Sequence, residues 1–160
     1  MRLSDLELEE IEDLLKTYRA DKRVQKMKNF IQHGIVTTYD HCDNVTRVSY
    51  WLNKRMHLHS DEKALVTGAF LHDFYLYDWH EKNKFHNWHG FFHPQRACKY
   101  ATRYFDINEK EQQIIKSHMW PLTLRSLPKS REAVIVSLAD KIVSTHETLF
   151  QRNKRVELCK

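Results

Sequence analysis

The adjacent residues His72 and Asp73 lie within an apolar stretch of helical spacing, between Ala64 and Leu76. An imidazole and a carboxylate that face a core are costly to bury unless they bind something, and a metal ion suits both. Four more potential ligands fall on the apolar faces of other predicted helices: His41, His93, His118 and Asp140. One such histidine alone is usually a hydrogen-bonded core residue. Six ligand-type side chains that converge from five helices would be satisfied together by one or two metal ions, so the sequence predicts one metal centre.

Apolar residues at helical spacing predict the segments that hold these ligands. The predicted helices cover about residues 4–30, 40–56, 60–72, 94–104 and 108–118, and a sixth begins near residue 130 with an apolar face that extends at least to residue 143. Asp40 and Ser60 are the expected caps of the second and third helices, and Pro94 suits the first position of the fourth. Gly68, one turn before His72, is expected to let a neighbouring helix approach closely.

Composition favours a helical protein. The chain has 160 residues, 41% of them apolar and 29% charged, with only three glycines and three prolines, which disfavours a turn-dense β-sandwich. We therefore predict an all-α fold: a single domain with a core of about residues 33–150, on which a helix of residues 4–30 packs.

Charge and cysteine usage limit the partners and the location. The net charge of +5 is spread among many acids and no nucleic-acid motif is present, so we expect a solvated surface and no specific nucleic acid. The three cysteines are scattered without a CxxC spacing, and no signal-like segment precedes them, which favours a reducing cytoplasm. No apolar run approaches the ~20 residues of a membrane span, so no membrane association is expected.

The order His41, His72-Asp73, Asp140 resembles the HD-domain superfamily of metal-dependent phosphohydrolases, which are helical bundles. The resemblance spans about residues 33–150, and Asp140 lies in a helical SLADK context at residues 137–141. His93 and His118 resemble the two extra histidines of the subgroup that holds two metals, in which the aspartate of the pair bridges the ions. The resemblance thus implies one or two divalent ions, and imidazole and carboxylate ligands suit Fe, Mn, Co, Ni, Zn or Mg.

The implied activity is hydrolysis of a phosphoester or phosphoanhydride bond in a nucleotide or another small phosphorylated metabolite. Asp73 and His72 are the expected catalytic residues with Lys141, whose ammonium would either contact phosphate or pair with an acid at the rim. Three other cations are weaker substrate-binding candidates: Arg47, Arg96 and Lys99. The chain lacks the Gly-Tyr-Pro motif of cyclic-dinucleotide phosphodiesterases and the acidic pair of alarmone hydrolases, and it looks closer to small stand-alone bacterial HD proteins.

Several alternatives stay open at this point. The aromatic and cationic segment from Leu76 to Phe92 is a candidate roof of the site. Within it, His86 or His89 would replace His93 as a ligand, or donate a proton to the leaving oxygen, because a spacing of four residues brings His89 and His93 within reach if that stretch is helical. A non-catalytic nucleotide sensor and a di-iron oxidative enzyme are the alternative functions. Both a monomer and a homodimer are compatible with the sequence. The remaining histidines are expected at the surface or at the edge of the core: His33, His57, His59, His80 and His146.

Overall fold

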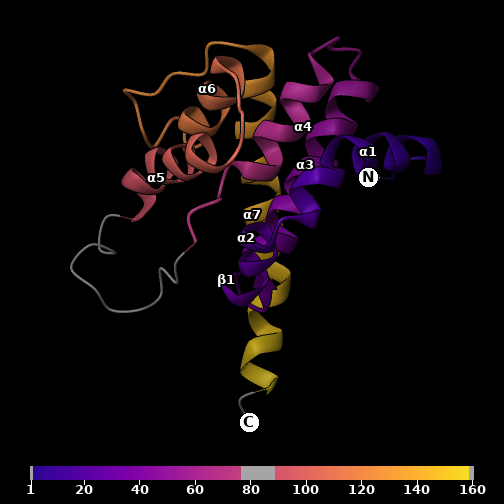
Figure 1. The fold of residues 1–160 in the computed structure, drawn as a ribbon. Helices are drawn as coiled ribbons and strands as arrows, with labels where there is room; N and C mark the ends of the chain where they lie inside the picture. The colour runs from indigo at the N-terminus through magenta and orange to yellow at the C-terminus, as the bar shows by residue number, and fades with distance from the viewer. Residues whose placement is uncertain (1, 77–88, 159–160) are drawn as a thin grey trace.

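The computed structural model describes residues 2–76 and 89–158, with side chains omitted for 89–90 and 151–158 (Figure 1). Its elements are α1 (Asp5–Ala20), α2 (Lys22–Gln25), the 3-10 helix η1 (Lys26–Asn29), β1 (Ile31–His33), β2 (Val36–Thr37), α3 (Thr38–Arg55), α4 (Glu62–Leu71), α5 (His89–Tyr104), α6 (Glu109–Ser117) and α7 (Arg131–Leu158). The predicted all-α class is confirmed, since the described part contains one short antiparallel strand pair besides the helices.

The segment predicted as one helix, residues 4–30, is divided into α1, α2 and η1. A capping box of Ser4 and Glu7 begins α1, and Asp21 ends it with an extended backbone, at φ −76° and ψ 127°. The Asp21 carboxylate accepts a hydrogen bond of 2.7 Å from the backbone N–H of Arg23 and thereby caps α2. The single-helix prediction was wrong because a short acidic side chain stabilises a cap better than a helix interior.

Two of the predicted caps are displaced along the chain. Thr37, with extended backbone, accepts from the N–H of Asp40 at 3.1 Å and caps α3, which places Asp40 in the first turn. Similarly, Asp61 rather than Ser60 accepts from the N–H of Ala64 and caps α4. Both segments offer two residues that are able to cap, and the backbone conformation decides between them.

Helix α5 begins at His89, so Pro94 lies inside it rather than at its first position. His93 therefore occupies the second turn of α5. Pro94 has no N–H to give to the helix, and buried small residues of α5, Ala97 and Ala101, belong to the core that packs this helix. Packing thus outweighs one lost backbone hydrogen bond.

Helix α4 is the central element. It packs against α3, α6 and α7, while α5 covers α6. Its residues from Ala64 to Leu71 are all buried, and they contribute to both apolar clusters of the core. A Cβ added at Gly68 would lie 2.7 Å from Cγ2 of Ile114, so the expected close approach is confirmed and the neighbour is α6.

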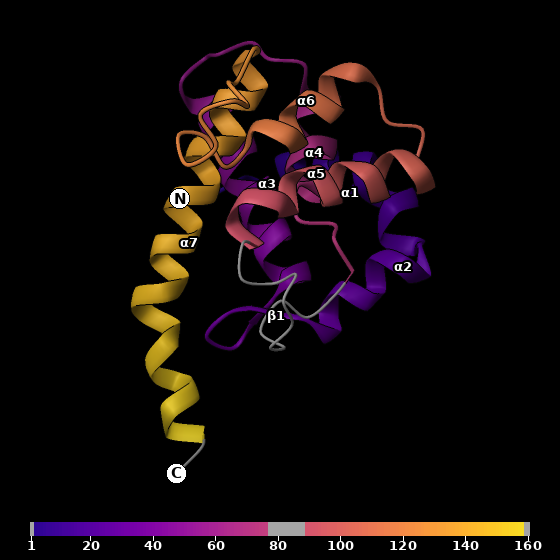
Figure 2. The ribbon, with the colours of Figure 1, turned by 90° about the vertical axis from the view of Figure 1, so that its left-hand side faces the viewer.

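The long helix α7 runs along one side of the bundle, and its C-terminal part continues beyond the other elements (Figure 2). Its N-terminal part packs on α3, α4 and α6. None of the helices in the described ranges combines the length and the apolar character that crossing a membrane requires.

Candidate metal centre

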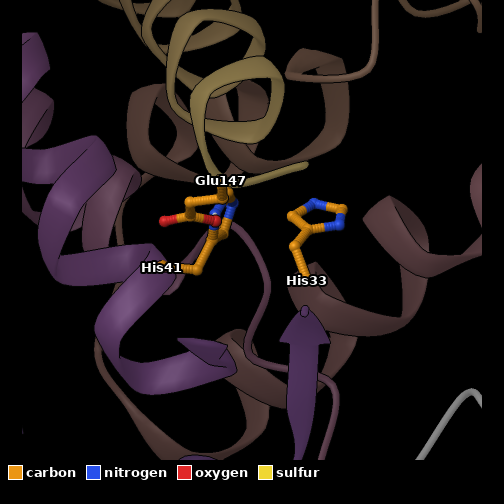
Figure 3. Close-up of side chains that lie close together, drawn as sticks. All are labelled: His33, His41 and Glu147. Carbon is orange, nitrogen blue, oxygen red and sulfur yellow. The ribbon is translucent and has the colours of Figure 1, made fainter. Parts of the chain in front are cut away.

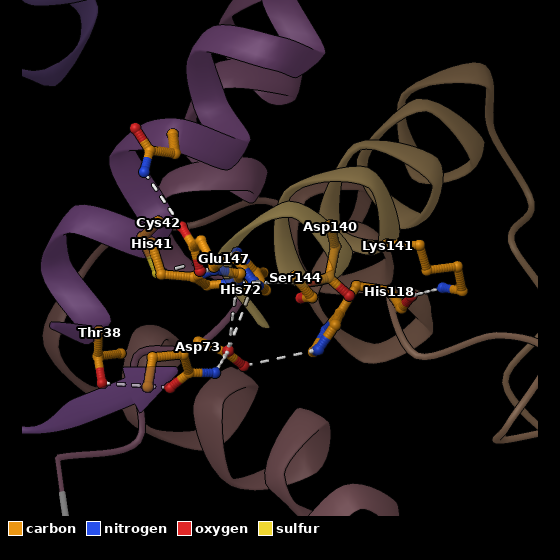
Figure 4. Close-up of polar contacts among 12 residues, drawn as sticks. Thr38, His41, Cys42, His72, Asp73, His118, Asp140, Lys141, Ser144 and Glu147 are labelled. Atoms are coloured by element: carbon orange, nitrogen blue, oxygen red, sulfur yellow. Dashed lines mark hydrogen bonds and ion pairs between the residues drawn. The ribbon is translucent and has the colours of Figure 1, made fainter. Parts of the chain in front are cut away.

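The six predicted ligands meet at the middle of the bundle: Figure 4 shows five of them, and His93 lies beside Asp73 and His118. They come from five places: His41 from α3, His72 and Asp73 from the end of α4, His93 from α5, His118 from the end of α6, and Asp140 from α7. None of the six is more than 7% exposed. Bulk water therefore does not solvate these six polar side chains, and their hydrogen-bonding and charged groups must find partners within the site.

Two of the histidines are presented in the same way. His72 follows the last residue of α4, and its Nδ1 lies 2.7 Å from the carbonyl oxygen of Ala69. His118 likewise follows α6, with Nδ1 2.8 Å from the carbonyl oxygen of Ile115. Each contact is to the carbonyl three residues earlier, which assigns the proton to Nδ1. The two Nε2 atoms are left as electron-pair donors at the centre, as metal ligation requires.

The carboxylate of Asp73 lies between two groups of imidazoles. Its Oδ2 is 4.0 Å from Nε2 of His41 and 3.5 Å from Nε2 of His72. Its Oδ1 is 3.2 Å from Nε2 of His93 and 3.6 Å from Nε2 of His118. One oxygen therefore faces each group, and this is the arrangement by which a carboxylate bridges two ions.

Asp140 completes the first group. Its Oδ1 lies 3.3 Å from Nε2 of His41 and 3.8 Å from Nε2 of His72, and it accepts a hydrogen bond of 3.1 Å from the Ser144 hydroxyl. The second group has no such additional carboxylate among the described residues, and its two imidazole nitrogens, Nε2 of His93 and of His118, approach to 2.8 Å. The first group thus offers four protein ligands and the second offers three.

These residues fit divalent ions. Within the described residues, Nε2 of His41, Nε2 of His72 and Oδ1 of Asp73 are buried without a hydrogen-bond partner. Ligand atoms held by one ion at roughly 2.1 Å lie about 3.0–3.4 Å apart in octahedral or tetrahedral geometry. The distances within the two groups, from 2.8 to 4.0 Å, bracket that range. A donor set of imidazoles and carboxylates suits the first-row divalent metals and Mg²⁺.

The charges of the site depend strongly on one another. Burial opposes the charged form of His41, but the nearby carboxylates of Asp140 and Glu147, which face Nε2 and Nδ1 of its ring, outweigh this effect and raise the pKa of His41 to about 10. Burial also opposes the ionised form of Asp73, yet His72, His93 and other neighbouring imidazoles hold the pKa of Asp73 well below its usual range. The metal-free centre is therefore an ion-pair network of ionised aspartate and cationic imidazole.

His118 is affected in the opposite direction. Burial, together with the neighbouring His72 and His93, lowers the pKa of His118 to about 3. Its ring is neutral at physiological pH, which is the form that ligates a metal.

A buried amide that the sequence did not single out holds Asp73. Gln32, on β1, donates a hydrogen bond of 2.7 Å from Nε2 to Oδ2 of Asp73. The Oε1 of Gln32 accepts from the hydroxyls of Tyr75 and Thr38, the latter at 3.3 Å. Gly34, with φ of 59°, forms the turn after β1 that a side chain would strain. The hairpin of β1 and β2 is therefore a positioning element of the centre.

Two further residues were not predicted as part of the site. Glu147, on α7, is 1% exposed, and its Oε2 lies 2.8 Å from Nδ1 of His41. His33, expected at the surface or at the edge, is half-buried, and its ring packs edge-on against that of His41 with centroids 5.5 Å apart (Figure 3). Ligand-type atoms of these three residues lie within 4.8 Å of one another. The spacing of seven residues from Asp140 to Glu147, two helical turns, is the signal in the sequence that could have indicated this side chain.

The predicted substrate-binding cations lie in different places. Lys141 donates to the carbonyl oxygens of His118 and Ser137 and to the Ser137 hydroxyl, at 3.0–3.1 Å. These three bonds engage the whole ammonium group and tie α7 to the end of α6. The predicted phosphate contact of Lys141 stays a prediction, and this geometry weighs against it.

The three other substrate-binding candidates differ in their contacts and in their position relative to the predicted ligands. Arg47 pairs with Asp43 at 2.7 Å and approaches Glu12 on α1, and Lys99 lines a surface groove between α5 and α6. Arg96 is half-buried on α5, three residues after His93, which is the spacing of neighbours on one helix face. Among these cations, Arg96 is the one that the helix geometry places beside a predicted ligand.

The alternative ligands are only partly described. His86 lies outside the described residues, as does the predicted roof segment from 77 to 88, and His89 is described only as the first backbone position of α5. His93 is the histidine whose Nε2 lies at the centre, 3.2 Å from Oδ1 of Asp73. The roles of His86 and His89 stay open.

A helical bundle with a buried cluster of histidines and aspartates at its centre defines a class of metal-binding protein. A family model described as HD domain matches residues 38–144, which is more than half of the chain, so the chain belongs to the HD domain family. This confirms the resemblance stated from the sequence. Most HD domains are metal-dependent hydrolases that bind divalent metals. Neither a curated protein nor a solved structure matches the chain.

Proposed function

We propose that the protein is a metal-dependent phosphohydrolase that cleaves a phosphoester or phosphoanhydride bond in a nucleotide or another small phosphorylated metabolite. The observation that carries the proposal is the position of Asp73, whose Oδ2 and Oδ1 face separate imidazole groups at distances of 3.2–4.0 Å. Membership of the HD domain family supports the same reaction class.

Divalent ions bound at the two groups would supply Lewis acidity toward phosphate oxygens and lower the pKa of a bound water. The protein's own contribution is positioning. Asp73 would hold the two ions at a fixed separation, while His41, His72 and Asp140 would hold one and His93 and His118 the other. The three-ligand group has fewer protein donors, so we infer that the substrate phosphate approaches there, on the side where Arg96 follows His93 along α5.

The test combines metal analysis with a phosphate-release screen. The protein, purified without chelator, is analysed for bound metals and then assayed over nucleotides, dinucleoside polyphosphates and small phosphomonoesters with Mn²⁺, Fe²⁺, Co²⁺, Ni²⁺, Zn²⁺ or Mg²⁺. We expect turnover of a member of this panel that disappears in Asp73→Ala and in the volume-matched Asp73→Asn. Asp106→Ala, the same change at an exposed aspartate, is the matched control. Phosphate release that survives both Asp73 variants would refute the proposal.

The alternative functions give different results in the same samples. A nucleotide sensor would show ligand-dependent thermal stabilisation without phosphate release from any member of the panel. A di-iron oxidative enzyme would consume oxygen and show a mixed-valent iron spectrum. Either result would refute the proposed hydrolase activity and support the corresponding alternative function.

A further inference from the structure

We propose that Glu147, anchored by Asn44, is the positioning residue that orients His41 as a metal ligand, so that it sets the affinity of one metal site and leaves the other unchanged. The proposal rests on the proposed function only in taking the cluster around Asp73 as a metal centre. It concerns a residue outside the six predicted ligands.

The first step is the comparison of the ligand histidines. His72 and His118 orient their rings through Nδ1 contacts to carbonyl oxygens of their own helices, at 2.7 and 2.8 Å. His41 instead places Nδ1 2.8 Å from Oε2 of Glu147, a carboxylate that lies on α7, 106 residues further along the chain than His41. The ring orientation of His41 therefore depends on tertiary structure, whereas that of His72 and His118 is fixed locally.

The second step is the geometry of α7. Asp140 and Glu147 are seven residues apart, two helical turns, and so project from the same face of α7. The ring of His41 lies between them, with Nε2 3.3 Å from Oδ1 of Asp140 and Nδ1 2.8 Å from Oε2 of Glu147. Figure 4 shows the three side chains together with their contacts. One face of one helix thus holds both nitrogens of this imidazole.

The third step is the state of the Glu147 carboxylate. It is 1% exposed, and a buried carboxylate is stable only when its oxygens are engaged. Oε2 faces His41 and Oε1 accepts a hydrogen bond of 3.1 Å from Nδ2 of Asn44, which lies three residues after His41 on α3. With its orientation fixed by Asn44, Glu147 accepts the Nδ1 proton of His41, so that Nε2 is the nitrogen that faces the centre and gives up its proton when a metal ion binds. A carboxylate in this position makes the imidazole a stronger ligand than a backbone carbonyl does.

A third metal ion is the competing explanation, because His33, His41 and Glu147 have ligand-type atoms within 4.8 Å of one another (Figure 3). That arrangement would need Nδ1 and Nε2 of His41 to be ligands at once. Both oxygens of Glu147 are already engaged by hydrogen bonds in the described structure. The positioning role is therefore the one we argue, and a third ion is an outcome of the test.

The experiment measures Zn²⁺ binding by competition with a chromophoric chelator. For the wild-type chain we expect two ions. Because loss of such a carboxylate partner costs about 10–100-fold in metal affinity, Glu147→Ala is expected to weaken one binding constant by that factor and leave the second unchanged. In Glu147→Gln, which keeps the volume and one acceptor oxygen, the affected Zn²⁺ binding constant should lie between those of the wild type and of Glu147→Ala. Glu9→Gln, the same change at an exposed glutamate of α1, is the control.

A second measurement separates positioning from a general loss of stability. In Zn²⁺-loaded protein labelled with ¹⁵N-histidine, the Nδ1 proton of His41 should exchange slowly in the wild type and in Glu147→Gln, and rapidly in Glu147→Ala. If Glu147→Ala does not fold, the binding constants of Glu147→Gln alone decide the question.

Three results would overturn the proposal. The first is that both Zn²⁺ binding constants are unchanged in the Glu147 variants. The second is that Zn²⁺ affinity falls equally at both sites while the melting temperature of the metal-free protein also falls. The third is a third bound Zn²⁺ that is lost in His33→Ala. A wild-type chain that binds none of the six divalent metals of the phosphate-release screen would end the proposed function as well, and this distinguishes that failure from a failure at Glu147.

Discussion

Replacement of Gly68 by alanine tests whether the close contact between α4 and α6 sets the geometry of the metal centre. The new Cβ would lie 2.7 Å from Cγ2 of Ile114, so the helices must separate by about 0.7 Å to reach an ordinary contact of 3.4 Å. Overpacking costs about 1–3 kcal/mol, and the better helix propensity of alanine offsets about 1 kcal/mol. Since three atoms of Ile114 lie within 3.0 Å of the new Cβ, the upper part of the range applies. We expect a net loss of about 1–2 kcal/mol, or about 2–8 °C in melting temperature.

The same substitution should reach the ligands. His72 follows Gly68 by four residues and His118 follows Ile114 by four, so the contact lies one turn from both rings, whose centroids are 4.8 Å apart. Helix separation should therefore weaken Zn²⁺ binding as well as lower the melting temperature. Calorimetry and zinc competition measure the two effects.

The control is a double-mutant cycle with Ile114→Ala, which removes Cγ2 and Cδ1 and should by itself cost about 2–5 kcal/mol. The loss in Gly68→Ala/Ile114→Ala should be smaller than the sum of the single losses, because the added methyl group occupies part of the vacated space. A Gly68→Ala protein that melts at or above the wild-type temperature, or strictly additive losses, would refute this reasoning.

Two further predictions concern parts of the fold outside the centre, and a third concerns a thiol beside it. Hydrogen bonds from Arg55 and the capping of α1 lower the pKa of Glu7 to about 2, so its contribution to stability is complete above its ordinary pKa near 4.5 and is lost as the pH falls toward 2. The difference in melting temperature between wild type and Glu7→Gln should therefore shrink over this interval, and a difference independent of pH would contradict it. Asn108 accepts from the N–H of Glu111 at 2.9 Å, so Asn108→Ala should cost about 1 kcal/mol in chemical denaturation, whereas Asn108→Asp should be nearly neutral. Burial raises the pKa of the Cys42 thiol well above its usual range, so mass spectrometry should find Cys42 unmodified by a thiol reagent until the protein unfolds, and rapid labelling of native protein would oppose this assignment.

The sequence was sufficient for the residues whose chemistry conflicts with their surroundings. Asp140 occupies the middle of an apolar helix face, and His72 and Asp73 end another, so each conflict was visible from helical spacing alone. The helices themselves followed from the same spacing, and the all-α class was predicted correctly. A polar side chain on the apolar face of its own helix can thus be selected as a candidate ligand without knowledge of the tertiary structure.

The residues that the sequence did not reveal act through others. Gln32 is a neutral amide on a three-residue strand, and nothing in its type indicates that it hydrogen-bonds Asp73 across 41 positions. Glu147 lies where polar residues become frequent in the sequence of α7, and its burial depends on the packing of α3 against that helix. His33 was assigned to the surface or the edge because it lies in the predicted break after the first helix, where no apolar helix face indicates burial. Each of these three residues lies beside a residue that is far away along the chain, and local spacing does not identify such neighbours.

The ligands come from five helical segments separated by up to about a hundred positions, so no single helix or pair of neighbouring helices contains the complete cluster. A cation held there would act as a reversible cross-link between distant parts of the polymer, formed only after the segments have assembled. Its contribution follows mass action: a free concentration a hundred times the dissociation constant adds about 2.7 kcal/mol to the free energy of unfolding. The resistance of this protein to heat and to proteases should therefore vary with the supply of metal around it.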